Sequence, residues 1–295
     1  MQSAGFLSAV FFYLKVGENL NQNWIIENLN NAFSTWNGKL GELWGLVTTG
    51  PQTFKGGAVW SVMQTLHNGM VGIGYALVVL FFAISLCKNT MNFHELKRPE
   101  AAIHYFLRFV AAKALVGYGM DIMLNVFSIC NGIVTDMADS MGGISEAMVS
   151  LPTEMQTAIE NVGFLASIPL WLVTILGSLL ITVLSFVMIL TVYGRFFRLY
   201  MYTALAPLPL AAFAGESTQS VGISFLKSYV GVCLEGAVIV LACVIYSAFV
   251  STPTVASGEA TTIVWSYLAE TVFNMLVLVG LIKGSDRIIH EMMGL

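Results

Sequence analysis

The sequence predicts an all-α protein, a polytopic bundle of transmembrane helices with five spans. Hydrophobic residues make up 57% of the 295 residues and charged residues only 10%, against about 25% charged residues in an average soluble domain. A water-exposed surface cannot be built from so few charges. Five apolar stretches each have about 20 residues or more, the length that a helix needs to cross a hydrocarbon core roughly 30 Å thick. These stretches are residues 69–87, 109–130, 162–190, 230–250 and 263–282.

The first 56 residues are predicted to form an external region that contains an amphipathic helix. Apolar side chains recur there at spacings of three and four, with mostly polar residues and glycine between them. The apolar residues are Ile26, Leu29, Phe33, Trp36, Leu40, Leu43, Trp44 and Val47. This pattern is typical of a helix that lies in the lipid headgroup plane, and the alternative is a helix packed on a soluble domain of a partner. Gly50 and Pro51 end this helix, and residues 57–295 are predicted to form the transmembrane helical domain.

A sixth apolar stretch, residues 199–213, differs from the other five. It is shorter and contains Pro207 and Pro209. Each proline removes a backbone hydrogen bond from a helix. We therefore expect this segment to be broken or re-entrant and not a straight span.

The charges in the connections predict the orientation in the membrane. The first connection is surrounded by basic residues: Lys88, Lys97, Arg98, Arg108 and Lys113. The second, residues 131–161, has acidic residues and no Lys or Arg. By the positive-inside rule the first connection is cytoplasmic and the second external. Arg195 and Arg198 follow the third span and return the chain to the cytoplasm. If residues 199–213 re-enter, the N-terminus is external and the C-terminus cytoplasmic.

Polar residues inside the predicted spans are the candidates for a functional site. In a continuous helix, Lys113, Asp121, Asn125 and Ser128 share one face of the second span. Charged groups at that depth are costly unless they face a bundle interior, a partner or water. This face is predicted to line a pore or a subunit contact, and the alternative is an intrachain basic partner for Asp121. Glu235 in the fourth span is a further candidate.

No pattern of catalytic residues is recognisable in the sequence. The four histidines are scattered, His94-Glu95 is not followed by the second histidine of an HExxH motif, and no P-loop or GxSxG is present. The four cysteines lie in or beside apolar runs without metal-binding spacing. We therefore expect neither an enzyme nor a bound cofactor or metal.

Three segments carry a resemblance to a known family: residues 193–199 (YGRFFRL), 206–211 (APLPLA) and 222–229 (GISFLKSY). They resemble the TrbL-like polytopic membrane subunit of type IV secretion and conjugation machines. That family has an arginine after the third span, a proline-containing apolar segment and a helix that re-enters the membrane. The likeness covers residues 162–295 in pattern and the whole chain in topology. The external connection after the second span is short here, so no role of a larger external loop is transferred.

The resemblance implies a homo-oligomeric component of a channel in the bacterial cytoplasmic membrane. Through such a channel a single strand of DNA with its bound relaxase leaves the donor cell. Partner ATPases at the cytoplasmic face would supply the energy. The basic residues Lys88, Lys97, Arg98 and Arg108, with Arg195 and Arg198, are candidates for docking these partners or for setting the topology against anionic lipids. The alternatives are a permease subunit of a small-molecule or peptide exporter and a membrane scaffold without a conduit.

Overall fold

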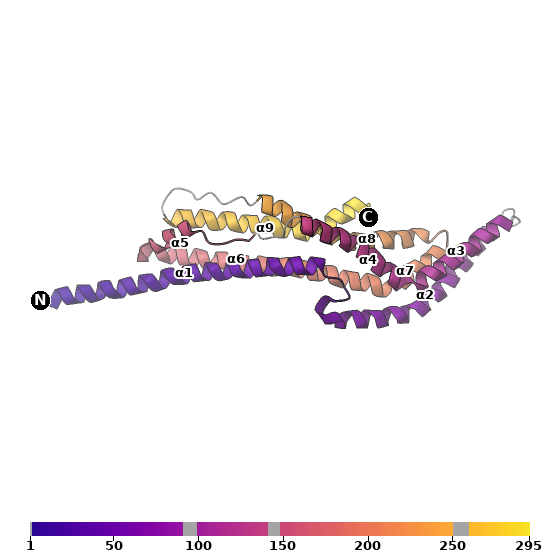
Figure 1. Ribbon diagram of the computed structural model, residues 1–295, viewed down its shortest axis with the longest axis horizontal. Helices are drawn as coiled ribbons and strands as arrows, with labels where there is room; N and C mark the ends of the chain where they lie inside the picture. Colours follow the sequence, from indigo (N-terminus) through magenta and orange to yellow (C-terminus); the bar gives the residue numbers. More distant parts are fainter. Residues whose placement is uncertain (1, 91–98, 141–147, 250–259) are drawn as a thin grey trace. The chain divides into compact units, whose positions relative to one another are not determined.

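The computed structural model describes residues 2–90, 99–140, 148–249 and 260–295, and every regular element in these ranges is a helix (Figure 1). The long helices are α1 (Gln2–Thr48), α2 (Ala58–Thr90), α3 (Pro99–Gly117), α4 (Gly119–Ser140), α6 (Phe164–Leu205), α8 (Gln219–Phe249) and α9 (Ala260–Met293). Between them lie the short helices η1 (Phe54–Gly57), α5 (Thr153–Glu160), α7 (Pro207–Ala211) and η3 (Ala212–Ala214). The all-α prediction is confirmed.

Four helical segments are long and apolar enough to cross a membrane: Phe54–Lys88, Ser167–Leu205, Gln219–Ala248 and Thr262–Met293. A fifth candidate is a helix pair, Ile103–Gly117 with Gly119–Asp139, which is bent by 72°. Counted as one broken span, this pair brings the total to the five that the hydropathy predicts. The protein is therefore a multi-pass, all-α membrane protein.

The chain forms two compact units, each made of segments that are distant in the sequence. Unit 1 contains Met1–Gly45, Met141–Thr191 and Leu241–Lys283. Unit 2 contains Leu46–Ser140, Val192–Val240 and Gly284–Leu295. The division at residue 56 into an external region and a transmembrane domain stays a prediction.

Helix α1 buries its apolar stripe inside unit 1. Leu29, Trp36 and Leu40 are fully buried there. On the same helix the Asn28 amide donates to Ser178 Oγ of α6 over 3.0 Å, and the Trp24 ring lies 5.5 Å from that of Trp171. The predicted amphipathic helix is present, but its apolar face is covered by the chain itself and not by a headgroup layer.

Helix α6 corrects the predicted boundary of the third span. It runs without interruption from Phe164 to Leu205, so Arg195, Arg198 and the first half of the predicted sixth stretch belong to this one helix. The helix stops at the first proline of the sixth stretch, because α7 begins at Pro207 and a proline is tolerated in the first turn of a new helix. The predicted break is present at Pro207, whereas Pro209 lies within α7.

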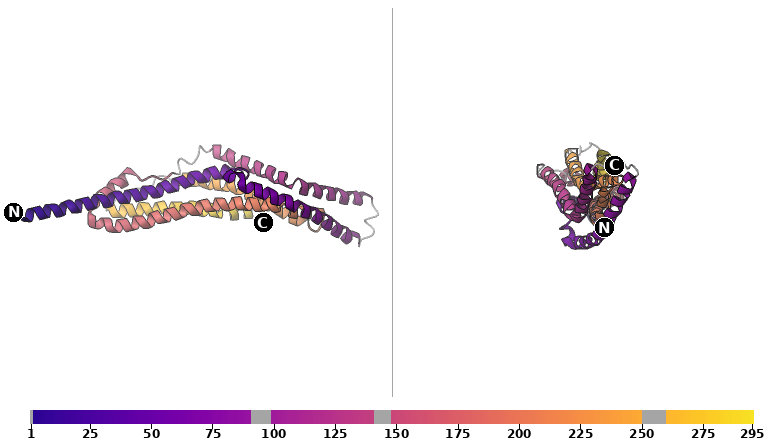
Figure 2. Two further views of the ribbon diagram at one scale, coloured as in Figure 1. Left: turned by 90° about the horizontal axis from the view of Figure 1, so that it is seen from below. Right: turned by 90° about the vertical axis from the view of Figure 1, so that its right-hand side faces the viewer.

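Helix α7 packs against both α2 and α3 within unit 2 (Figure 1). Helices α2 and α3 also lie side by side, as Figures 1 and 2 show. The contact depends on Gly74 of α2. A Cβ on Gly74 would lie 2.9 Å from the carbonyl oxygen of Pro207 and 2.9 Å from Val116 Cγ1. Glycine at this position therefore lets three segments meet at one point.

The bend between α3 and α4 lies at Tyr118, between Gly117 and Gly119. A Cβ on Gly119 would lie 3.2 Å from Leu210 Cδ1 and 3.4 Å from His67 Cε1. The bend therefore lies where α7 and α2 come close to it, and Gly117 and Gly119 leave room for this approach. The prediction that Lys113 and Ser128 share one face of a continuous helix is wrong, because periodicity is lost across a 72° bend.

Candidate functional site

Arg195 of α6 is a fully buried cation in unit 2. Its guanidinium donates to three backbone carbonyls: Val232 O through Nε over 3.2 Å, Cys233 O through Nη2 over 3.1 Å and Val47 O through Nη1 over 3.4 Å. Five fixed donors suit arginine to such a set of carbonyls. The side chain therefore ties α6 to α8 and to the end of α1.

One turn further along α6, Arg198 forms the centre of an ion cluster. Its Nη2 donates to both carboxylate oxygens of Glu235 over 2.7 Å, and its Nη1 forms an ion pair with Asp286. Ser285 Oγ donates to Glu235 Oε1 over 3.1 Å. We call Arg198, Glu235, Ser285 and Asp286 the ion cluster. It joins α6, α8 and α9 within unit 2.

Three residues that the sequence predicted as site residues have partners inside unit 2, Glu235 and Arg198 in the ion cluster and Arg195 beside it. Glu235, predicted to face a pore or another subunit, is 1% exposed and faces the interior of the unit. Arg195 and Arg198, predicted to dock partners or to set the topology, donate inside the unit: Arg195 to backbone carbonyls that include Val232 O of α8, and Arg198 to carboxylates of α8 and α9. The side of the membrane on which they lie stays a prediction.

The other predicted residues surround a polar hollow on the α4 side of the bend. This bend hollow has a volume of about 550 Å³. Its lining is Gly50, Pro51, Gln52, Asp121, Leu124, Asn125, Phe127, Ser128 and Asn131. Asp121, Asn125 and Ser128 are thus brought together as predicted, at a four- and three-residue spacing along α4. Lys113 lies before the bend on α3, is exposed, and is not part of the lining.

The polar groups of the bend hollow are largely without partners inside the chain. Asp121 is exposed and makes no ion pair or hydrogen bond with any residue in the ranges that the structure describes. Asn131 donates from Nδ2 to Thr48 O over 3.3 Å, while its Oδ1 is buried without a partner. The alternative of a basic partner for Asp121 is therefore not seen in the described part of the chain. The hollow can accept hydrogen bonds and positive charge from outside.

The remaining basic residues of the first connection differ in their exposure and in their hydrogen-bond partners. Lys88 is exposed at the end of α2, and Arg108 of α3 is half-buried and donates to Gln219 Oε1 of α8 over 2.6 Å. Lys97 and Arg98 lie outside the described residues. Lys88 is thus available at a surface, whereas Arg108 also holds α3 to α8.

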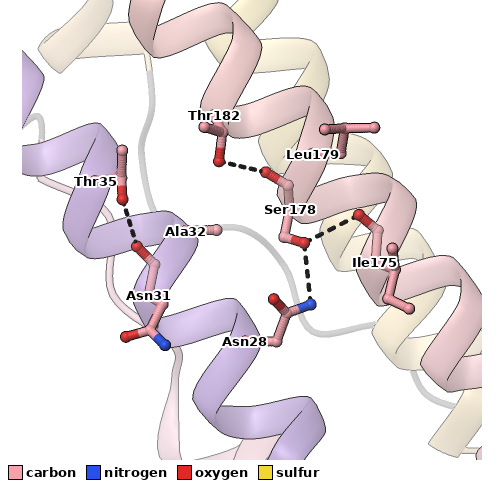
Figure 3. A pocket seen from close by; sticks show the side chains of 8 residues that line it. All are labelled: Asn28, Asn31, Ala32, Thr35, Ile175, Ser178, Leu179 and Thr182. Atoms are coloured by element: carbon pink, nitrogen blue, oxygen red, sulfur yellow. Dashed lines mark hydrogen bonds between the residues drawn. The ribbon is translucent and has the colours of Figure 1, made fainter.

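Unit 1 also has a hollow, lined by both polar and apolar side chains, which the sequence did not predict (Figure 3). Its volume is about 340 Å³, and it is lined by Asn28, Asn31, Ala32, Thr35, Ile175, Ser178, Leu179 and Thr182 of α1 and α6. Asn28 reaches across to α6, where Ser178 accepts its hydrogen bond, and Asn31 lies on the exposed face of α1. We call it the amide hollow. The several asparagines between residues 21 and 37 were the sequence signal for it.

A scan against protein-family models matches residues 36–207 to the TrbL/VirB6 plasmid conjugal transfer like protein family. This match covers more than half of the chain. The chain belongs to the TrbL/VirB6 family. Comparisons with curated proteins and with solved structures found no match.

The TrbL/VirB6 match has different limits from the resemblance found in the sequence. It includes all of the bend hollow, Arg195, Arg198 and the first residue of α7, Pro207. It ends before Glu235 and before residues 222–229, which the resemblance had included. As a TrbL/VirB6 protein, the chain is a membrane component of a conjugal transfer system, and its partners are other components of that system.

Proposed function

We propose that this TrbL/VirB6 protein is a homo-oligomeric subunit of the translocation channel in the bacterial cytoplasmic membrane. It helps to move single-stranded DNA with bound relaxase out of the donor cell. It has no catalytic activity of its own, and cytoplasmic ATPases of the machine supply the energy. Lys88, Lys97 and Arg98 contact these ATPases or anionic headgroups.

The main support is the bend hollow. A carboxylate in a membrane-spanning segment is costly unless it faces water, a partner or an opposite charge. Asp121 is exposed there without a partner in the described residues and is surrounded by the polar side chains of Asn125 and Ser128. A face of this kind fits a water-filled conduit or a contact between subunits.

A donor-cell assay tests this function. Deletion of the gene is expected to abolish conjugation from the donor and to leave the recipient's competence unchanged. Asp121→Leu is expected to reduce transfer while the protein still reaches the membrane. Asp139→Leu is the matched control, because Asp139 is exposed on the same helix but does not line the hollow. Normal conjugation from the deletion donor would eliminate the channel function.

A permease subunit of a small-molecule or peptide exporter is the second candidate. The observation in its favour is the size of the bend hollow, about 550 Å³, which lies within the range of about 300–1,000 Å³ of small-ligand sites. A permease needs no other component of the transfer machine. Transport by the chain alone, reconstituted in vesicles, would favour this candidate.

The proposed orientation places the N-terminus outside and the C-terminus in the cytoplasm, with α7 and η3 as part of a re-entrant segment. Cysteine labelling tests it in a chain that carries Cys87→Ser, because Cys87 is the exposed native cysteine among the described residues. An impermeant thiol reagent added outside is expected to label Ser150→Cys and not Met292→Cys. Labelling of Met292→Cys from outside would mean that residues 199–213 cross the membrane.

A further inference from the structure

Two charges of opposite sign flank the bend between α3 and α4. Lys113 lies in the last turn and a half of α3, and Asp121 in the first turn of α4. Both side chains are exposed. Within the described ranges, neither has an ion pair or a hydrogen bond, whereas Arg198 and Glu235 of the same unit pair with each other.

Both charges lie deep in the broken span. If residues 103–139 cross once, Asp121 is at the middle of the segment and Lys113 is eight residues before it. Unpaired charges at this depth are unfavourable by several kcal/mol on insertion scales. The chain therefore presents a cation and an anion that both need a partner.

The bend hollow has the chemistry of an ammonium site. A lysine ammonium has three donor hydrogens and no acceptor. The hollow has the two carboxylate oxygens of Asp121 and the exposed side chains of Asn125 and Ser128. These groups supply one negative charge and more acceptors than an ammonium needs.

We propose that Lys113 of one copy inserts into the bend hollow of the next copy and pairs there with Asp121. This inference rests on the proposed homo-oligomeric channel and names the contact that joins its subunits. Lys113 is not part of the lining of the hollow that would accept it, and the proposed contact runs in one direction from copy to copy, which makes it head-to-tail. Contacts of this type close into rings when the rotation between copies allows it. Each copy in a ring then satisfies one charge of each neighbour.

Cross-linking between differently tagged copies tests the contact. One copy carries Lys113→Cys and the other Asp121→Cys, both with Cys87→Ser, and both are expressed in the same cell. A bifunctional thiol reagent is used, because a Lys–Asp contact holds the two Cα atoms too far apart for a direct disulfide. A covalent dimer with both tags is expected. Asp139→Cys in place of Asp121→Cys is the control and should give none, since it lies about 27 Å further along α4.

A charge swap tests the same pair by function. Lys113→Asp and Asp121→Lys are each expected to reduce DNA transfer about tenfold or more, because close interfacial charge pairs contribute at least that factor to affinity. The double variant should restore transfer to near the wild-type level. A structural role for either residue alone predicts no such rescue.

The outcomes separate this contact from the channel function. If no mixed dimer forms and the double variant is as defective as the single ones, the contact is overturned. If Asp121→Leu still impairs transfer in that case, the hollow faces a conduit or another component, and the proposed function stands. If a mixed dimer forms while a deletion donor conjugates normally, the contact stands and the proposed function falls.

Discussion

Two carboxylates of unit 2 have opposite surroundings. Glu235 is buried and accepts hydrogen bonds from Arg198 and Ser285. Asp121, in contrast, is exposed in the bend hollow without a partner in the described residues. A charge that is satisfied inside the chain holds helices together. A charge that is left unsatisfied in a membrane span indicates contact with something outside the chain. From this difference we expect the ion cluster to serve stability, and the bend hollow is the proposed functional site.

Glu235→Leu is expected to have the largest effect on stability. It removes the bidentate partner of Arg198 and the acceptor of Ser285, and breaking a buried pair costs about 3 to 5 kcal/mol. Thermal unfolding of the detergent-extracted protein should show a strongly lowered midpoint. Asp139→Leu, an exposed carboxylate in the same unit, should leave the midpoint unchanged. An unchanged midpoint in Glu235→Leu would remove the contrast between the two carboxylates.

Gly74→Ala is expected to have the next largest effect. The added methyl would meet Pro207 O and Val116 Cγ1, both at 2.9 Å, and overpacking of this kind costs about 1–3 kcal/mol. The same thermal measurement applies. Gly72→Ala is the matched control, because nothing lies within 4 Å of its Cβ position, and there alanine should be neutral or stabilising. Equal behaviour of the two variants would mean that α7 does not pack on α2 in this way.

Asn28→Ala is expected to have a moderate effect in unit 1. It removes the hydrogen bond to Ser178 Oγ, and a hydrogen bond of this kind contributes about 0.5–1.5 kcal/mol. Asn31→Ala is the control, since Asn31 is exposed on the same helix. A larger loss in Asn31→Ala than in Asn28→Ala, by thermal unfolding, would contradict the packing of α1 on α6.

Asp121→Leu is expected to have the smallest effect on stability. Changes at exposed positions usually stay within about 0.5 kcal/mol, and Asp121 has no partner in the described chain to leave unpaired. The unfolding midpoint should be close to that of the wild type, although DNA transfer falls. A destabilisation as large as that of Glu235→Leu would show that Asp121 has a structural partner.

The sequence predicted those features that depend on local pattern. Hydropathy located the five spans, the prolines located the end of α6, and the spacing in residues 26–47 located the buried stripe of α1. What covers that stripe is a tertiary property, and it was wrongly assigned to headgroups. The bend at Tyr118 was missed because it depends on Leu210 and His67, which are distant in the sequence. The inward direction of Arg198 likewise depends on residues 235 and 286.

Gly236 gives the buried arginine a further consequence. A Cβ at this position would lie 2.8 Å from both Nη atoms of Arg195, so the guanidinium fills the volume that a side chain at 236 would otherwise take. A residue larger than glycine at 236 is therefore compatible only with a smaller side chain at 195. Alanine at 236 would displace the guanidinium, and leucine at 195 would remove the guanidinium hydrogen bonds to Val232 O and Cys233 O. In relatives of this chain, we expect the two positions to vary together: a residue larger than glycine at 236 should occur where the arginine at 195 is replaced.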